Sequence, residues 1–119
     1  MLLDSVIVID RLNRIPAALG FFSRHADLTV SAVTVAEVLA GVEEDGHAEI
    51  SAFLDTFSFL GVDSAVAELA GRLRRTESWK MPDALQAATA QHHGLQLVTR
   101  NTKDFRPERH PFVVVPYTI

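Results

Sequence analysis

Four acidic side chains with the chemistry to hold a metal ion stand in separate segments of the chain: Asp4, Glu37, Asp83 and Asp104. Carboxylates a few ångströms apart repel each other by about 1 kcal/mol per pair in water, and by about 4 kcal/mol at the effective dielectric of a protein surface. If these acids share one crevice, they need a cation, and their hard oxygen ligands suit Mg²⁺ or Mn²⁺. Such a centre is typical of metal-assisted phosphoester chemistry.

Short apolar runs predict the strands that would bring these acids together. The runs LTVS (28–31), LQLVT (95–99) and FVVV (112–115) lack polar alternation, as expected of parallel strands covered on both faces. Residues 57–60 are a further candidate strand, ended by Gly61.

Helical periodicity lies between these runs. Apolar residues at i, i+3, i+4 and i+7 predict helices over 35–42, 50–57 and 66–73. Strands alternating with helices predict an α/β fold, a three-layer α/β/α sandwich with a short parallel sheet. A chain of 119 residues is the size of one domain, so we expect a single domain over 1–119.

The first segment, LLDSVIVID at residues 2–10, fits two structures. Its valine and isoleucine content favours a strand, whereas Asp4 and Ser5 are good N-cap residues and favour a helix. The pattern alone leaves both open.

The predicted sheet gathers the polar residues at one edge. Ligands of an open parallel sheet bind outside the carboxyl ends of its strands, where the connecting helices begin. Asp4 follows the opening pair Leu2-Leu3, and Ser31, Thr34 and Glu37 come with or after the run LTVS. Asn101 and Asp104 follow the run LQLVT, and Asp83 opens the alanine-rich helix ALQAATAQ. We therefore expect the four carboxylates to share one crevice.

Each acid also has a local alternative. Asp4 and Asp83 are candidate N-caps, and Thr34 with Glu37 matches the capping box S/T-x-x-E. Asp104 fits a solvated turn. Asp10 and Arg14 have the i, i+4 spacing of a surface ion pair.

Charge is divided unevenly along a chain whose formal net charge is −4. Residues 1–71 carry three basic and eleven acidic side chains, whereas residues 72–119 carry eight basic and four acidic ones. Because there is no cysteine, any metal has oxygen or imidazole ligands, and a cytoplasmic location is expected. Charges interrupt the N-terminal apolar segment, so neither a signal peptide nor a membrane span is expected.

With these residues in view, the chain resembles the PIN-domain ribonucleases, and among them the VapC-type toxins of bacterial toxin-antitoxin pairs. Four ordered motifs carry the resemblance: LLDSVIVID (2–10), SAVTVAEVLAG (31–41), MPDALQAATA (81–90) and LVTRNTKDF (97–105). It implies a strand ending at Asp4 and a helix starting at Ser5. It also implies hydrolysis of RNA with Mg²⁺ or Mn²⁺, a homodimer, and a small antitoxin that covers the site.

By the same resemblance, Asp4, Glu37 and Asp83 correspond to the metal-binding acids. The chain departs from the pattern at Asn101, where relatives often have a fourth acid, so Asp104 is expected to supply that charge. A second departure is Val6, which replaces a polar residue.

Contacts to the substrate are expected from four residues beside the acids: Ser5, Thr34, Arg100 and Lys103. Basic side chains further along extend a possible phosphate track: Arg72, Arg74, Arg75, Lys80, Arg106 and Arg109.

Two other functions fit part of this pattern. A phospho-acceptor receiver domain has a similar length and fold class, but it needs two acids after its first strand, where Asp4 stands alone, and a lysine where Arg100-Asn101 stands. An inactive PIN-like interaction module is the other alternative, supported by the amide at Asn101.

Overall fold

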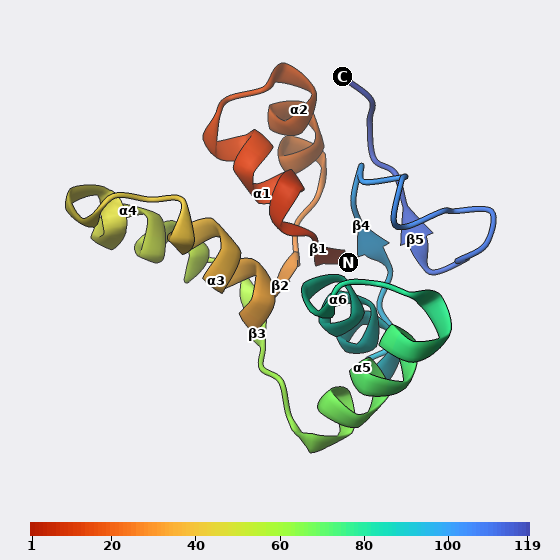
Figure 1. Ribbon diagram of the computed structural model, residues 1–119. Coiled ribbons are helices and arrows are strands. Elements are labelled where there is room, and N and C mark those ends of the chain that lie inside the picture. The colour runs from red at the N-terminus through yellow and green to blue at the C-terminus, as the bar shows by residue number, and fades with distance from the viewer.

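A five-stranded parallel sheet forms the centre of the computed structural model, which describes residues 1–119 (Figure 1). The strands are β1 (Leu2–Leu3), β2 (Thr29–Ser31), β3 (Ser58–Leu60), β4 (Leu97–Val98) and β5 (Val113–Val114). Their order in the sheet is β3-β2-β1-β4-β5, and every neighbouring pair is parallel. The chain order reverses between β1 and β4, which is the place where open α/β sheets bind ligands.

Six helices connect and cover these strands. They are α1 (Ser5–Leu12), α2 (Pro16–Arg24), α3 (Ala32–Ala40), α4 (Glu44–Leu54), α5 (Ser64–Glu77) and α6 (Met81–His92). In Figure 1, α3 and α4 extend to one side of the sheet, while α5 and α6 lie side by side at another. None of the helices combines the length and the apolar composition that crossing a bilayer requires.

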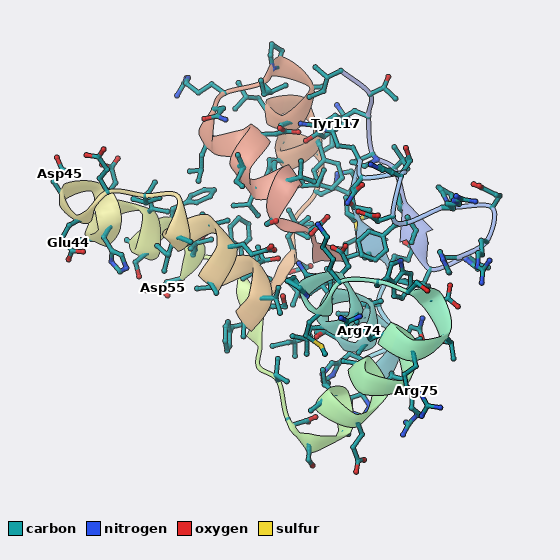
Figure 2. The ribbon with its side chains drawn as sticks, viewed as in Figure 1. Glu44, Asp45, Asp55, Arg74, Arg75 and Tyr117 are labelled. Atoms are coloured by element: carbon teal, nitrogen blue, oxygen red, sulfur yellow. The ribbon has the colours of Figure 1, made fainter.

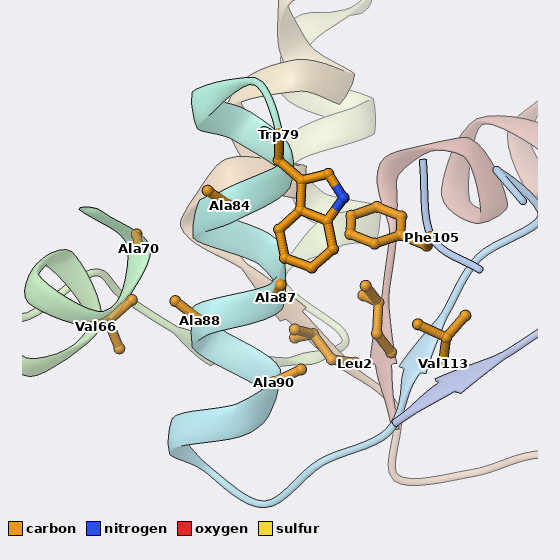
Figure 3. Close-up of a cluster of buried hydrophobic side chains, with 11 residues drawn as sticks. Leu2, Val66, Ala70, Trp79, Ala84, Ala87, Ala88, Ala90, Phe105 and Val113 are labelled. Carbon is orange, nitrogen blue, oxygen red and sulfur yellow. The ribbon is translucent and has the colours of Figure 1, made fainter. Parts of the chain in front are cut away.

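Neighbouring residues of one strand face opposite layers of the core. Leu2 of β1 and Leu97 of β4 belong to a cluster with α5 and α6, in which the alanines of α6 lie beside Trp79 and Phe105 (Figure 3). Leu3 and Val98 belong to a second cluster, with α1 to α4. The sheet therefore has helices on both faces, which confirms the predicted α/β sandwich.

The ambiguous N-terminal segment contains both a strand and a helix. The Asp4 carboxylate accepts a hydrogen bond from the Ser5 backbone N–H at 2.9 Å and caps α1. Ile7 and Val8 are fully buried on α1, so their apolar surface is used by a helix rather than by a longer strand. The strand itself is only two residues long.

The strand order excludes the receiver alternative. Receiver domains have the order 2-1-3-4-5, in which the first strand lies next to the third. Here β1 lies between β2 and β4, and β3 is an edge strand.

Candidate functional site

A pocket of about 470 Å³ opens at the carboxyl ends of β1 and β4. We call it the acidic pocket; its lining residues are Asp4, Ser5, Val6, Glu37, Asp83, Arg100, Asn101, Thr102 and Lys103. Three of the four predicted acids thus line one space, although they belong to α1, α3 and α6 or to the turns before them. The convergence expected from the parallel sheet is present for these three.

Asp4 is held in place by donors from three parts of the chain. One carboxylate oxygen accepts from the Ser5 backbone N–H at 2.9 Å and from the Gln86 amide at 3.2 Å. The other accepts from the Thr99 hydroxyl at 2.6 Å. Asp4 is only 6% exposed, so its orientation is fixed by these bonds. Asp4 therefore both caps α1 and lines the acidic pocket, so the two interpretations of this residue do not exclude each other.

Gln86 links these elements beneath the pocket. No sequence motif pointed to this residue. Its amide N–H₂ also donates to the Thr34 hydroxyl at 2.6 Å, and its amide oxygen accepts from the Ser31 hydroxyl at 2.6 Å. Gln86 is 1% exposed. The only sequence signal for a buried role of Gln86 was its position as a polar residue among the alanines of α6. Its partners Ser31 and Thr34 lie more than fifty residues away in the sequence, so these contacts were not predictable.

The structure corrects the prediction that Thr34 contacts the substrate. Thr34 is fully buried, and its hydroxyl donates to the Leu3 carbonyl at 2.9 Å while accepting from Gln86. Its hydrogen-bonding capacity is used inside the protein, so it supports the site from below.

The capping-box alternative for Glu37 is also wrong. Ser31 is the N-cap of α3 and accepts from the Thr34 backbone N–H at 3.1 Å. Glu37 therefore lies in the body of α3, where its exposed side chain lines the acidic pocket.

Asp83 does not cap α6, contrary to the local alternative. Lys80 holds the N-cap position, and Asp83 lies in the first helical turn, where it faces the pocket. Burial, and to a smaller extent the neighbouring charges of Asp104, Asp4 and Glu37, together raise the pKa of Asp83 to about 6. Lys80 acts in the opposite direction. The repulsion among carboxylates that the sequence predicts is thus present at Asp83.

Asp104 does not line the acidic pocket, so the structure brings three of the four predicted acids to its wall. Its carboxylate is exposed and accepts from the Asn101 amide at 3.0 Å, while Asn101 itself lines the pocket. Among the neighbouring charges, that of Asp104 nevertheless has the largest effect in raising the Asp83 pKa. It acts on the pocket through its charge.

Arg100 is paired with a carboxylate that the sequence assigned to another partner. Its guanidinium donates to Asp10 through Nε at 2.7 Å and Nη2 at 2.9 Å, and Tyr117 donates to the same carboxylate at 2.9 Å. The predicted pair of Asp10 with Arg14 is absent, because α1 ends at Leu12 and Arg14 has a left-handed backbone with φ 58°. The buried Asp10 instead fixes Arg100 at the pocket rim, with Lys103 and Ser5 also on the lining.

We expect Asp10→Asn to lower the free energy of unfolding by about 1–3 kcal/mol at pH 7. The Arg100 hydrogen bond holds the pKa of Asp10 below its usual value of 3.8. The carboxylate therefore stabilises the fold above that value, and this contribution is lost as the pH falls below it. Denaturant unfolding at several pH values should show a gap between wild type and variant that narrows below about pH 4.

The exposed Glu49→Gln in α4 is the matched control, because it removes one charge without a buried partner. An unchanged gap between pH 7 and pH 3 would contradict an ionic role for Asp10.

The donor set of the acidic pocket suits a hard divalent cation. No three histidine, aspartate or glutamate side chains stand close enough to enclose an ion unaided. Mg²⁺ typically takes only one or two protein carboxylates, with water and substrate phosphate as its other ligands. Oxygen ligands from Asp4, Glu37, Asp83 and Asn101, together with the raised Asp83 pKa, fit such an ion.

Comparison with protein families gives a match to the PIN domain over residues 1–107. The chain belongs to the PIN-domain family. This result confirms the resemblance drawn from the four sequence motifs.

Solved structures of toxin-antitoxin proteins share the fold. A toxin-antitoxin complex from Klebsiella pneumoniae contains a chain that is 35% identical, with a TM-score of 0.88; the match covers 99% of this PIN domain protein and 98% of that chain. FitAcB from Neisseria gonorrhoeae gives a TM-score of 0.82 at 23% identity, over 99% of each chain. DNA-bound VapBC from Salmonella typhimurium gives a TM-score of 0.78 at 22% identity, and the match covers 94% of this chain and 92% of that chain. A search of curated proteins gives no significant match.

Proposed function

We propose that this PIN domain protein is a Mg²⁺- or Mn²⁺-dependent endoribonuclease and the toxin of a toxin-antitoxin pair. The observation that carries the proposal is the acidic pocket itself. Carboxylates from three separate segments line one space. Burial, and then the charges of Asp104, Asp4 and Glu37, raise the pKa of Asp83 to about 6. Buried and mutually repelling acids in a cleft are typical of functional sites.

In the proposed site, Asp4, Glu37 and Asp83 would hold the cation directly or through water molecules, with Asn101 and Asp104 completing its surroundings. When bound, the ion activates a water molecule and stabilises charge on the phosphodiester. The chain contributes orientation, because Thr99 and Gln86 fix the Asp4 carboxylate.

Two basic residues and one hydroxyl are the proposed contacts to the substrate. Arg100 is positioned by Asp10 at the rim, Lys103 is exposed beside it, and Ser5 lines the floor of the pocket. Guanidinium and ammonium groups bind phosphate, so these side chains would place the scissile phosphodiester next to the acids.

The proposed partners follow from the relatives. The Klebsiella pneumoniae structure is a toxin-antitoxin complex, and its chain matches this one over nearly the full length of both. We therefore propose a small antitoxin as inhibitor. The homodimer is proposed from the resemblance of the sequence motifs to PIN-domain toxins. The cytoplasm is the proposed location, because it contains both RNA and antitoxin.

Titration of the purified protein with Mg²⁺ or Mn²⁺, with cleavage of RNA as the readout, tests the proposal. Wild type should cut internally within a labelled RNA only when the ion is present, and EDTA should stop the reaction. Asp4→Asn should lower the rate at least about 100-fold, because a neutral amide is a poor ligand for a hard cation.

Wild-type protein that binds RNA without cutting it in any divalent ion would instead support the inactive-module alternative. Equal rates for wild type and Asp4→Asn would indicate a contaminating nuclease and count against the proposal.

A further inference from the structure

A second cleft lies beside the acidic pocket, and most of its lining residues have no part in the proposed chemistry. Its volume is about 330 Å³. We call it the Trp79 cleft; its lining residues are Thr76, Glu77, Ser78, Trp79, Lys103, Asp104, Arg106, Arg109 and His110. It lies between the α5–α6 turn and the segment that joins β4 to β5.

The two spaces meet at Lys103. Its side chain lines both the acidic pocket and the Trp79 cleft, and Asp104 next to it lines the cleft. A linear ligand with one group in the acidic pocket therefore has a direct path over Lys103 into the cleft.

The Trp79 cleft is held rigid by its own packing. The Trp79 indole N–H donates to the Asp104 backbone carbonyl at 2.8 Å, and its ring lies 5.3 Å from the ring of the fully buried Phe105. The His110 ring lies 5.0 Å from Trp79 on the other side. The segment carrying Lys103, Arg106 and Arg109 is thereby fixed before any ligand binds. Preorganisation of this kind reduces the entropy lost on binding.

The charges of the cleft favour an anionic ligand. Three exposed cations, Lys103, Arg106 and Arg109, line it against two acids, Glu77 and Asp104. Arg109 Nε is paired with Glu77 at 3.2 Å. His110 also lies 3.4 Å from Glu77. The excess of basic side chains belongs to the C-terminal part of the chain, residues 72–119. Acids such as Glu44, Asp45 and Asp55 lie apart from it, on α4 or at its C-terminal end (Figure 2). Positive side chains spaced along a path match the repeating charge of a phosphodiester strand.

The cleft is built to bind backbone rather than bases. Trp79 is 5% exposed and Phe105 is fully buried, so neither ring is free to stack on a base. Contacts to phosphate carry no sequence information directly.

We propose that the RNA strand leaving the acidic pocket crosses Lys103 and lies in the Trp79 cleft, with its phosphates on Arg106 and Arg109. This inference rests on the proposed function, which it extends by a subsite next to the cleavage position. The subsite supplies affinity that is independent of RNA sequence.

Fluorescence anisotropy with a labelled single-stranded RNA in EDTA tests the inference, because binding is then measured without cleavage. Arg106→Gln and Arg109→Gln should each raise Kd by about 3–10-fold and reduce the slope of log K against log salt by about 0.7. Arg14→Gln is the matched control, since Arg14 is exposed in the acidic part of the chain. It should change neither quantity.

Glu77→Gln should have the opposite effect. It removes the carboxylate that pairs with Arg109 and faces His110, so Kd should fall about 2–5-fold and the salt slope should steepen. Glu68→Gln is the matched control, because it removes an exposed acid outside the cleft, and it should leave Kd and the salt slope close to those of wild type.

The inference is overturned if wild type does not bind RNA in EDTA, if the cleft variants match Arg14→Gln, or if Glu77→Gln weakens binding. Cleavage in Mg²⁺ is assayed separately. Cleavage by wild type with unaffected cleft variants would remove only the subsite. Absence of wild-type cleavage in every divalent ion would remove the proposed function, whatever the cleft variants show.

Discussion

Asp83→Asn should make the metal-free protein more stable at pH 8 and should reduce RNA cleavage at least about 100-fold. Stability and activity are expected to move in opposite directions because burial disfavours the charged Asp83 carboxylate, and Asp104, Asp4 and Glu37 repel it. A bound divalent cation would offset this repulsion, because the same carboxylates would be its ligands. The neutral amide removes the repulsion and, with it, a cation ligand.

The pH dependence follows from the pKa of Asp83, which is about 6 in the folded protein against a usual 3.8. Between these values the folded state binds more protons than the unfolded state, so metal-free wild type gains stability as the pH falls from 7 towards 4. After discounting for partial exposure, the gain is about 1–2 kcal/mol. Asp83→Asn lacks this gain. Its advantage over wild type should therefore be largest above pH 7 and should vanish near pH 4.

Denaturant unfolding in EDTA measures this difference, and Glu68→Gln is the control. Glu68 is an exposed acid on α5 that does not line the acidic pocket, so its replacement removes one charge without touching the site. Addition of Mg²⁺ should stabilise wild type and Glu68→Gln, because a ligand that binds only the folded state shifts the equilibrium towards it. Asp83→Asn should respond weakly. If Asp83→Asn is less stable than wild type in EDTA at pH 8, the repulsive cluster is refuted.

The placement of Asp4, Glu37 and Asp83 was predictable because it depends on topology. Each residue follows a predicted strand or opens a predicted helix, and the carboxyl ends of parallel strands meet at one edge. The structure brings these three acids to one pocket. Their roles as ligands remain predictions.

Contacts over long sequence separations were not predictable. Asp10 was assigned to Arg14 four residues away, but its partners are Arg100 and Tyr117, ninety and more residues along the chain. Periodicity reports which face of a helix is buried, whereas pairing across the fold depends on how the elements pack. The exclusion of Asp104 from the acidic pocket has the same origin, since Asp104 belongs to an irregular segment.

Helix α2, Pro16–Arg24, was also missed. Its two buried residues, Ala18 and Phe21, are too few to produce a helical repeat. Proline at its first position was the available signal, because proline is favoured there.

Gln86→Leu should cost about 2–4 kcal/mol of unfolding free energy and weaken Mn²⁺ binding about 10-fold or more. The substitution leaves the buried Ser31 hydroxyl without its acceptor and removes a donor from both Thr34 and Asp4. Each orphaned buried group carries a desolvation cost of about 1–3 kcal/mol. The Asp4 carboxylate keeps only Ser5 and Thr99 as donors and becomes free to turn.

Calorimetric titration of the RNA-free protein with Mn²⁺ separates this positioning role from simple loss of stability. Gln91→Leu makes the same chemical change on the exposed side of α6 and should alter neither stability nor affinity. A ligand that turns freely loses entropy on binding, so Gln86→Leu should bind Mn²⁺ more weakly even at temperatures where the variant is fully folded. Wild-type Mn²⁺ affinity in folded Gln86→Leu would mean that Thr99 and Ser5 alone orient Asp4, and that Gln86 serves only the packing of α6 against α3.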